Sequence, residues 1–149
     1  MDHEPAPEAP SDEFPLLLPT GRTVYQFHTR TKTGRAPELN AAAPEPWVEL
    51  SAQDAQGLAV SEGDLVRVES ARGTVEAHAR ISGIRPGTVF VPFHFGYWDQ
   101  GAGEPTAVGR AANELTRTIW DTVSKQPLYK VTAVRVAKPG GGTGLAPSL

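Results

Sequence analysis

The chain of 149 residues contains no cysteine. This absence excludes disulfide bonds, zinc–thiolate sites, iron–sulfur ligation and a catalytic thiol, and it is compatible with a reducing compartment. Apolar runs are also short. None approaches the roughly 18–20 residues of a membrane-spanning helix, and the first residues lack the charged and apolar regions of a signal peptide. These absences predict a cytoplasmic protein that makes no contact with a membrane.

Motifs that carry catalysis are missing as well. The sequence has no GxSxG nucleophile elbow and no HExxH zinc motif. His28, His78 and His94 lack the spacing of metal ligands, and His78 falls on the polar phase of a predicted strand. Gly101-Ala102-Gly103 resembles part of a dinucleotide fingerprint, but Glu104-Pro105 follows where the fingerprint needs a helix. We expect neither a catalytic residue nor a directly ligated metal in this chain.

The charge is low and unevenly distributed. The chain holds 14 basic and 17 acidic residues, for a net charge of −3. Residues 1–13 contain five acids and no lysine or arginine, so the remaining body is mildly basic. That surplus is too small for the continuous basic face of a general nucleic-acid binder, and we expect no nucleic-acid partner.

The composition of the two ends differs from that of the centre. Residues 1–13 form an acidic, proline-rich leader that we expect to be disordered, and residues 139–149 form a flexible glycine-rich tail. Residues 14–138 are then a single folded domain. A compact domain between two flexible tails suggests a module of something larger, although frayed ends of an independent protein have the same composition.

The central residues are mainly β-forming. A buried strand is expected at Phe14–Leu18, a hairpin at Leu65–Ser70 and Val75–Ile81, and a last strand at Tyr129–Ala137. Two short helices are expected. Ser51 caps the first, which should end at a left-handed Gly57, and the second should run from Glu114 to about Trp120. With about six strands and one or two short helices interleaved, the pattern predicts a mostly β fold, namely a small closed barrel.

A basic segment follows the first strand. Residues 20–35 hold five threonines and four basic residues, and no acid lies between Phe14 and Pro37. Gly21 allows backbone amides to approach a ligand, threonines donate hydroxyl hydrogen bonds, and Arg22 can grip a phosphate with two parallel donors. The segment therefore predicts an anionic ligand, with a diphosphate as the obvious candidate. The alternative is an ordinary solvated basic loop.

A second unusual segment spans residues 89–116. It begins as a strand with Val89, Val91 and Phe93 in alternation, and it becomes aromatic and polar at once from Phe93 to Gln100. Rings bury area at low entropy cost, while imidazoles and amides fix orientation, so the segment suits a flat, polar ligand. The alternative is a long surface loop with a buried aromatic anchor.

A series of short motifs runs in order through residues 14–138. The motifs are Thr20-Gly21-Arg22 with Tyr25 and His28-Thr29, Trp47-Val48-Glu49-Leu50 with Asp54-Ala55, Glu62-Gly63-Asp64-Leu65-Val66-Arg67-Val68, Ser70-Ala71-Arg72-Gly73, Arg85-Pro86-Gly87-Thr88-Val89-Phe90, Pro92-Phe93-His94, Asn113-Glu114-Leu115-Thr116 and Ser124-Lys125-Gln126-Pro127-Leu128-Tyr129-Lys130. Each alone is weakly specific. The ordered series resembles the C-terminal domain of the molybdopterin oxidoreductases, the bis-molybdopterin guanine dinucleotide enzymes that include formate dehydrogenases and nitrate reductases.

The resemblance implies a double-psi β-barrel of about six strands that binds molybdopterin guanine dinucleotide. The Thr20–Thr29 loop would contact the pterin and diphosphate, Asn113 would hydrogen-bond the cofactor, and Lys130 would pair with a cofactor oxygen. Phe93 and His94 would lie at the mouth, near the substrate funnel. The implied cofactor-binding residues are Thr20, Gly21, Arg22, Thr23, Tyr25, His28, Thr29, Asn113 and Lys130.

The sequence departs from the family pattern at two places. The segment from Gly96 to Ala111 is longer than the usual link, so no roles carry over to Tyr97, Trp98 and Asp99. Leu128 stands where an acidic residue is frequent, which alters the expected surroundings of Lys130.

The resemblance also implies an incomplete enzyme, because in this family the ligand to molybdenum or tungsten and the cluster cysteines lie in other domains. The chain would then be a cofactor-binding part that is not catalytic alone, a monomer when isolated, with the remaining domains of a parent oxidoreductase as its partners. A stand-alone double-psi barrel that senses a nucleotide or binds a protein is the alternative, since fold does not fix function.

Overall fold

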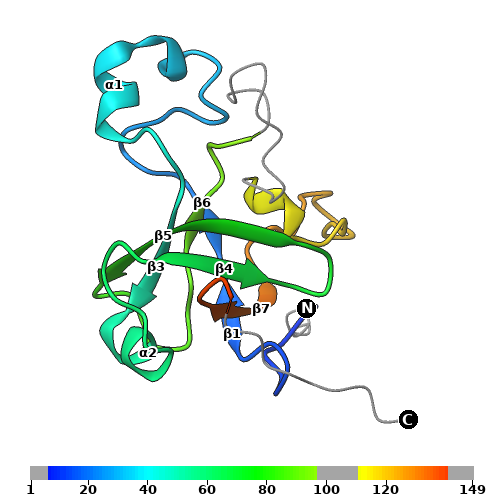
Figure 1. Ribbon diagram of the computed structural model, residues 1–149. Coiled ribbons are helices and arrows are strands. Elements are labelled where there is room, and N and C mark those ends of the chain that lie inside the picture. The colour runs from blue at the N-terminus through cyan, green and yellow to red at the C-terminus, as the bar shows by residue number, and fades with distance from the viewer. Residues whose placement is uncertain (1–6, 97–110, 141–149) are drawn as a thin grey trace.

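The computed structural model describes residues 7–96 and 111–140, and these form a mostly β structure with a few short helices (Figure 1). The coarse fold class predicted from the sequence is therefore confirmed. In chain order the elements are β1 (Leu16–Leu18), β2 (Thr20–Gly21), the 3-10 helix η1 (Thr33–Arg35), α1 (Pro37–Ala42), β3 (Trp47–Ser51), α2 (Ala52–Gly57), β4 (Leu65–Glu69), β5 (Thr74–Ser82), β6 (Val91–Pro92), the 3-10 helix η3 (Ala112–Glu114) and β7 (Thr132–Ala137).

The strands form a curled five-stranded sheet of order β1-β7-β4-β5-β3 and a separate parallel pair, β2 with β6. The predicted hairpin is present, with β4 and β5 antiparallel and Val68 opposite Val75. Strand β3 pairs with β5 in parallel, which requires the chain to cross over through α2. The last strand begins at Thr132 rather than at Tyr129.

The segment before β6 links the two edges of the curled sheet. The backbone N–H of Leu17 in β1 donates to Gly87 O at 2.9 Å, and Val89 N–H donates back to Leu17 O at 2.9 Å. On the other side, Glu49 of β3 exchanges both backbone hydrogen bonds with Phe90, at 2.8 and 3.1 Å. The two edge strands therefore find their partner in one segment, which leaves little of either edge unpaired.

The turn that delivers this segment has the predicted chemistry. Thr88 N–H donates to Arg85 O at 3.1 Å, and Gly87 has φ of 80° after Pro86. A positive φ at the third position, with proline at the second, is the geometry of a type II turn, which only glycine adopts without strain.

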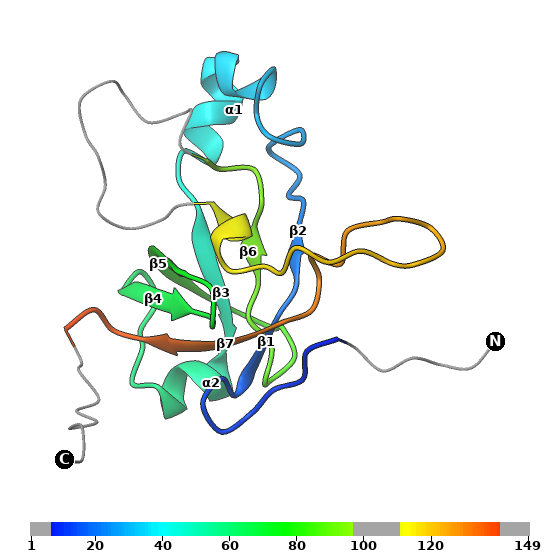
Figure 2. The ribbon, with the colours of Figure 1, turned by 90° about the vertical axis from the view of Figure 1, so that its right-hand side faces the viewer.

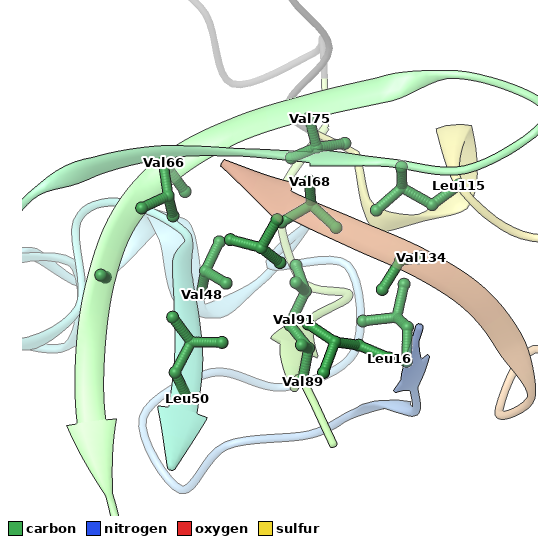
Figure 3. Packing of buried hydrophobic residues seen from close by; sticks show 14 of the residues in the cluster. Leu16, Val48, Leu50, Val66, Val68, Val75, Val89, Val91, Leu115 and Val134 are labelled. Atoms are coloured by element: carbon green, nitrogen blue, oxygen red, sulfur yellow. The ribbon is translucent and has the colours of Figure 1, made fainter. Parts of the chain in front are cut away.

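Aliphatic side chains from every long strand fill the inside of the curl (Figure 3). The alternation that predicted the strands explains this, because every second residue points inward. Fully buried members include Val66, Val68 and Val75 of the hairpin. The residues that Figure 3 labels are Leu16, Val48, Leu50, Val66, Val68, Val75, Val89, Val91, Leu115 and Val134.

Helix α2 begins as predicted and ends differently. The Ser51 side chain accepts from the Asp54 N–H at 3.0 Å, which caps the first turn. Gly57 was expected to adopt the left-handed conformation. In the structure Ala59 adopts it instead, with φ of 53°. Val60 N–H donates to Ala55 O at 2.8 Å, as in a Schellman motif, and both side chains are buried. Because Val60 is buried in this motif, the residue with positive φ is the one before it, Ala59.

A lobe that the sequence analysis did not predict lies beyond the sheet, formed by residues 22–43 with η1 and α1 (Figure 1). Gln26, which is 5% exposed, connects its parts, because its amide nitrogen reaches Leu39 O and Ala43 O while its oxygen accepts from the Thr33 hydroxyl at 2.6 Å. Helix α1 is short and has no buried residue, so it gave no amphipathic signal.

The second predicted helix is wrong in its position. The 3-10 turn η3 ends at Glu114, and no helix covers Leu115 to Trp120. Leu115 instead enters the core with 0% exposure. The turn between β4 and β5 packs here too, since a Cβ on Gly73 would lie 2.7 Å from Glu114 O. This close contact explains why glycine follows Arg72.

Part of the acidic leader lies against the domain. Glu8 forms a salt bridge of 2.9 Å with Arg72, whose Nε also donates to Leu115 O at 3.0 Å. Arg117 donates to Pro7 O at 2.6 Å. In the structure, Glu8 and the Pro7 carbonyl of the leader thus each contact an arginine of the body, and the disorder of residues 1–13 stays a prediction. Residues 1–6 and 141–149 lie outside the described residues.

Candidate functional site

A cavity of about 800 Å³ lies where the loop after β2 meets the segment before β7. Among the predicted site residues, seven line it, and they come from four separate parts of the chain. They are Thr20, Arg22, His28, Thr29, Phe93, Asn113 and Lys130. The structure thus places residues from both segments that were predicted to face a ligand, residues 20–35 and 89–116, on one common hollow.

The parallel pair β2–β6 positions the floor of this cavity. Thr20 lies opposite Val91 and Gly21 opposite Pro92, so the ends of two distant segments leave the pair side by side. Thr20 is 3% exposed, and its hydroxyl donates to Tyr129 O at 3.3 Å, which joins β2 to the opposite wall. Gly21 does not line the cavity. A Cβ there would lie 2.7 Å from Phe90 Cε2, so packing explains this glycine.

The loop of residues 22–30 forms the basic wall. His28 and Arg30 both have positive φ, 45° and 64°, so two residues with side chains adopt the left-handed conformation in this loop. Arg22 donates to Nε2 of His28 at 3.3 Å, and both side chains are exposed to the cavity. The guanidinium and the imidazole therefore stand together where an anion could contact both.

Besides Gly21, three predicted residues do not line the cavity, namely Thr23, Tyr25 and His94. The backbone N–H of Thr23 donates to His94 Nε2 at 2.8 Å, and the buried Thr23 hydroxyl has no hydrogen-bond partner. Tyr25 is 40% exposed and does not line the cavity. His94, expected at the mouth beside Phe93, is fully buried. Phe93 lines the cavity and its ring centroid lies 5.0 Å from that of His94.

His94 lies behind the basic loop, with both ring nitrogens engaged. Nε2 accepts from the Thr23 N–H, so Nδ1 carries the proton and donates to the His28 carbonyl. Burial lowers the pKa of His94, and the charges of Arg30, Arg22 and His28 act in the same direction, while the bond to the His28 carbonyl opposes them. The imidazole is therefore held neutral.

The opposite wall is formed by residues 126–131. Besides Lys130 it contributes Gln126, Pro127, Leu128, Tyr129 and Val131. From the Ser124–Lys130 motif, a contact was predicted only for Lys130. A loop whose residues are nearly all exposed has no periodicity, so the motif itself was the only available signal. Leu128, which replaces a frequent acid, faces the same hollow as Lys130.

A smaller hollow of about 280 Å³ adjoins the cavity and shares Asn113, Pro127 and Tyr129 with it. Its other lining residues lie between 116 and 120 and include Arg117 and Trp120; the chain then continues into the loop that projects from the domain in Figure 2. Trp120 is 56% exposed and Val123 on the same loop is 75% exposed. Asn113 therefore lies where the two hollows meet.

Among the residues 7–96 and 111–140, the cavity wall carries Arg22, His28 and Lys130 and no Asp or Glu. Such a wall favours an anion, and threonine hydroxyls and the amides of Asn113 and Gln126 add neutral hydrogen-bonding groups. In the described part of the chain, no group of three or more His, Asp or Glu side chains could hold a metal ion. Nor does any described helix have the length and apolarity to span a membrane. Tyr97, Trp98, Asp99 and Gln100 lie outside the described residues.

Comparison with known proteins gives consistent matches over the whole domain. Residues 16–133 match the family model described as Molydopterin dinucleotide binding domain. The chain is 37% identical over 139 residues to the alpha subunit of a formate dehydrogenase from Methanocaldococcus jannaschii, with 93% of this chain and 19% of that protein covered. It is 38% identical over 134 residues to the periplasmic nitrate reductase of Desulfovibrio desulfuricans, covering 89% and 16%. The chain therefore spans less than a fifth of the length of these curated relatives.

A solved structure supports the same fold. The acetylene hydratase from Pelobacter acetylenicus superposes with a TM-score of 0.71 over 84% of this chain and 18% of that one, at 21% sequence identity. At this identity the likeness concerns the fold alone.

Proposed function

Because the chain belongs to the molybdopterin dinucleotide-binding domain family, we propose that it binds molybdopterin guanine dinucleotide in the cavity between residues 20–29 and 126–131. The family assignment supports this cofactor. The observation that carries the assignment to this cavity is its lining of Arg22, His28 and Lys130, with no acid among the lining residues that the structure describes.

The residues present fit a pterin-diphosphate. Arg22 and Lys130 offer charged donors for diphosphate oxygens, and Asn113 and Gln126 offer amides that can donate to and accept from a heterocycle. Phe93 and Tyr129 supply apolar area against flat rings. We assign Thr20, Arg22, His28, Thr29, Asn113 and Lys130 as direct contacts, and Gly21 and Thr23 as residues that shape the loop. Tyr25 and His94 have no assigned contact.

The double-psi barrel is the finer fold that we propose for this domain. Two features support it: the parallel pair β2–β6, and the backbone bonds by which the segment from Gly87 to Phe90 joins β1 to β3. Together they join the two edges of the curled sheet, whereas consecutive hairpins alone would leave both edges open.

The parent protein would be a larger molybdenum or tungsten oxidoreductase, since the relatives exceed this chain several-fold in length. The bound cofactor would supply the metal at which redox chemistry occurs, and this chain would bind, orient and shield it. The substrate of the parent protein would be a small oxyanion or acid such as nitrate or formate. A cytoplasmic location stays a prediction, as one relative is named periplasmic.

Titration of the 149-residue chain with GDP, followed by amide NMR shifts, tests the site. We expect shifts that are concentrated at the six assigned contacts. Arg22→Ala should weaken binding at least about tenfold, because a charged hydrogen bond to phosphate contributes roughly 1.5–3 kcal/mol. Arg85→Ala is the matched control, since Arg85 is exposed and does not line the cavity.

Shifts confined to another face, or equal affinity for both variants, would contradict this proposal. In a parent enzyme that contains the module, Arg22→Ala and Asn113→Ala should lower extractable guanine nucleotide and metal together. A chain that binds GDP tightly with no parent protein in its genome would instead favour the nucleotide-sensing alternative.

A further inference from the structure

The segment that follows β6 packs directly behind the loop of residues 22–30. His94 is 0% exposed and Phe95 is 3% exposed, so neither side chain meets solvent. The guanidinium of Arg30 lies 4.5 Å from the centroid of the Phe95 ring. Residues 94 and 95 together therefore form a platform on which this loop rests, although neither lines the cavity.

The hydrogen bonds of His94 reach both ends of the turn that carries Arg22 and His28. Nε2 accepts from Thr23 N–H at 2.8 Å, next to Arg22, and Nδ1–H donates to the carbonyl of His28 itself. An amide N–H can only donate and a carbonyl can only accept, so one neutral tautomer fits both bonds. A protonated ring would offer two donors and lose the bond to Thr23.

The turn needs such support because its backbone is costly. His28 has φ of 45° and Arg30 has φ of 64°, and residues with side chains adopt this region only when surrounding contacts hold them there. The contact of 3.3 Å between Arg22 and His28 then depends on the same turn. Without the platform, neither basic side chain would be fixed against the cavity.

We propose that His94 is a positioning residue, which as a neutral imidazole ties Thr23 to His28 and so holds Arg22 and His28 at the wall of the cavity. Its significance for cofactor binding rests on the proposed function. The clamp, by which we mean the two hydrogen bonds from His94 to Thr23 and His28, can be tested without a cofactor. Among the described residues, the charged or titratable groups that act on His94 are Arg22, His28 and Arg30, and all of them are basic. All three disfavour its protonation.

The first measurement needs no variant. Nitrogen-15 shifts of the imidazole in the 149-residue chain at neutral pH should show His94 as the neutral Nδ1–H tautomer. Hydrogen exchange should show a protected Thr23 amide that loses protection when acid protonates the ring. A charged ring at neutral pH, the Nε2–H tautomer, or an unprotected Thr23 amide would each overturn the proposal.

Variants then separate positioning from general stability. His94→Ala should accelerate exchange of the Thr23 amide at least about tenfold, as the loss of one buried hydrogen bond implies, while the Val89 amide keeps its protection. His94→Gln, whose amide can both donate and accept, should recover part of this protection. His78→Ala is the control, because His78 is exposed on β5 and away from the cavity. Equal exchange rates of the Thr23 amide in wild type and His94→Ala would contradict the proposal.

Adding GDP distinguishes the two proposals. If the tautomer and the Thr23 exchange behave as expected but GDP does not bind, the clamp stands and the proposed function fails. If GDP binds and His94→Ala leaves both Thr23 exchange and GDP affinity unchanged, the positioning role fails while the proposed function stands.

Discussion

The interior of the curled sheet and the rim of the cavity are held together in different ways. The interior consists of aliphatic side chains such as Val68 and Leu50, which are fully buried and make no directional bonds. The rim consists of exposed side chains such as Arg22 and Asn113, and its backbone is held by a few long-range polar contacts. We therefore expect the interior to determine stability and the rim to determine what the domain binds, so substitutions should separate the two properties.

The largest effect is expected from Leu50→Ala. Leu50 lies in β3 with 0% exposure, and its truncation should lower the free energy of unfolding by about 2–5 kcal/mol, because a cavity remains in a packed core. Urea unfolding of the 149-residue chain measures this. Leu65→Ala, at a residue that is 42% exposed, should cost less than about 1 kcal/mol. Equal losses for the two variants would mean that the interior does not dominate stability.

Gly73→Ala should have the next largest effect. The added methyl group would lie 2.7 Å from a backbone oxygen of Glu114, so η3 or the hairpin must shift, at a cost of about 1–3 kcal/mol. Because η3 carries Asn113, we expect altered amide shifts at Asn113 as well. Gly83→Ala is a matched control, since nothing lies within 4 Å of its added methyl group. A Gly73→Ala protein with unchanged stability and unchanged Asn113 shifts would show that the two regions are not coupled here.

The free energy of unfolding should depend on pH through His94, the buried residue behind the basic loop. Its pKa is lowered in the folded state, chiefly by burial, so the unfolded chain binds a proton more readily. Stability attributable to the neutral ring is present above the ordinary pKa of histidine, near 6.5, and is lost as pH falls below it, at up to about 1.4 kcal/mol per pH unit. Urea unfolding at several pH values should show this slope, and His94→Gln should remove that contribution. A slope that persists in the variant would assign the effect to another group.

The smallest effect is expected at the leader. Glu8→Gln removes the charge that pairs with Arg72, whose side chain is 27% exposed, so the cost should be below about 1 kcal/mol and should shrink with added salt. Thermal unfolding at low and high salt measures it. Glu13→Gln is a control within the same leader. A loss above about 2 kcal/mol would mean that residues 7–13 belong to the cooperative fold.

Much of the interior could be predicted from the sequence. Alternation in Leu65–Ser70 and Val75–Ile81 predicted the hairpin and its buried face, because strand side chains point to opposite sides in turn. Local chemistry also predicted the Ser51 cap and the turn at Pro86 and Gly87. These features depend on neighbours within a few residues, so the sequence contains all that they require.

The rim could be predicted only as a set of candidate residues. Composition and the family motifs pointed to residues 20–29, 113 and 130, but the role of His94 behind the loop was not foreseen. Helix α1 was missed, and the helix expected after Glu114 is absent. In each case the outcome depends on a partner far along the chain, as with Gln26 and Ala43 or Leu115 and Arg72.

The sequence by itself determined the β-rich core, the turn chemistry and the kind of ligand, since these follow from side-chain period and residue type. Only the tertiary structure decided that Arg22, Asn113 and Lys130 share one hollow, and that His94 is a buried support instead of a wall residue. The physical reason is that periodicity tells which side of a strand is apolar, whereas the meeting of distant loops depends on how the sheet curls and on which backbone groups still need a partner.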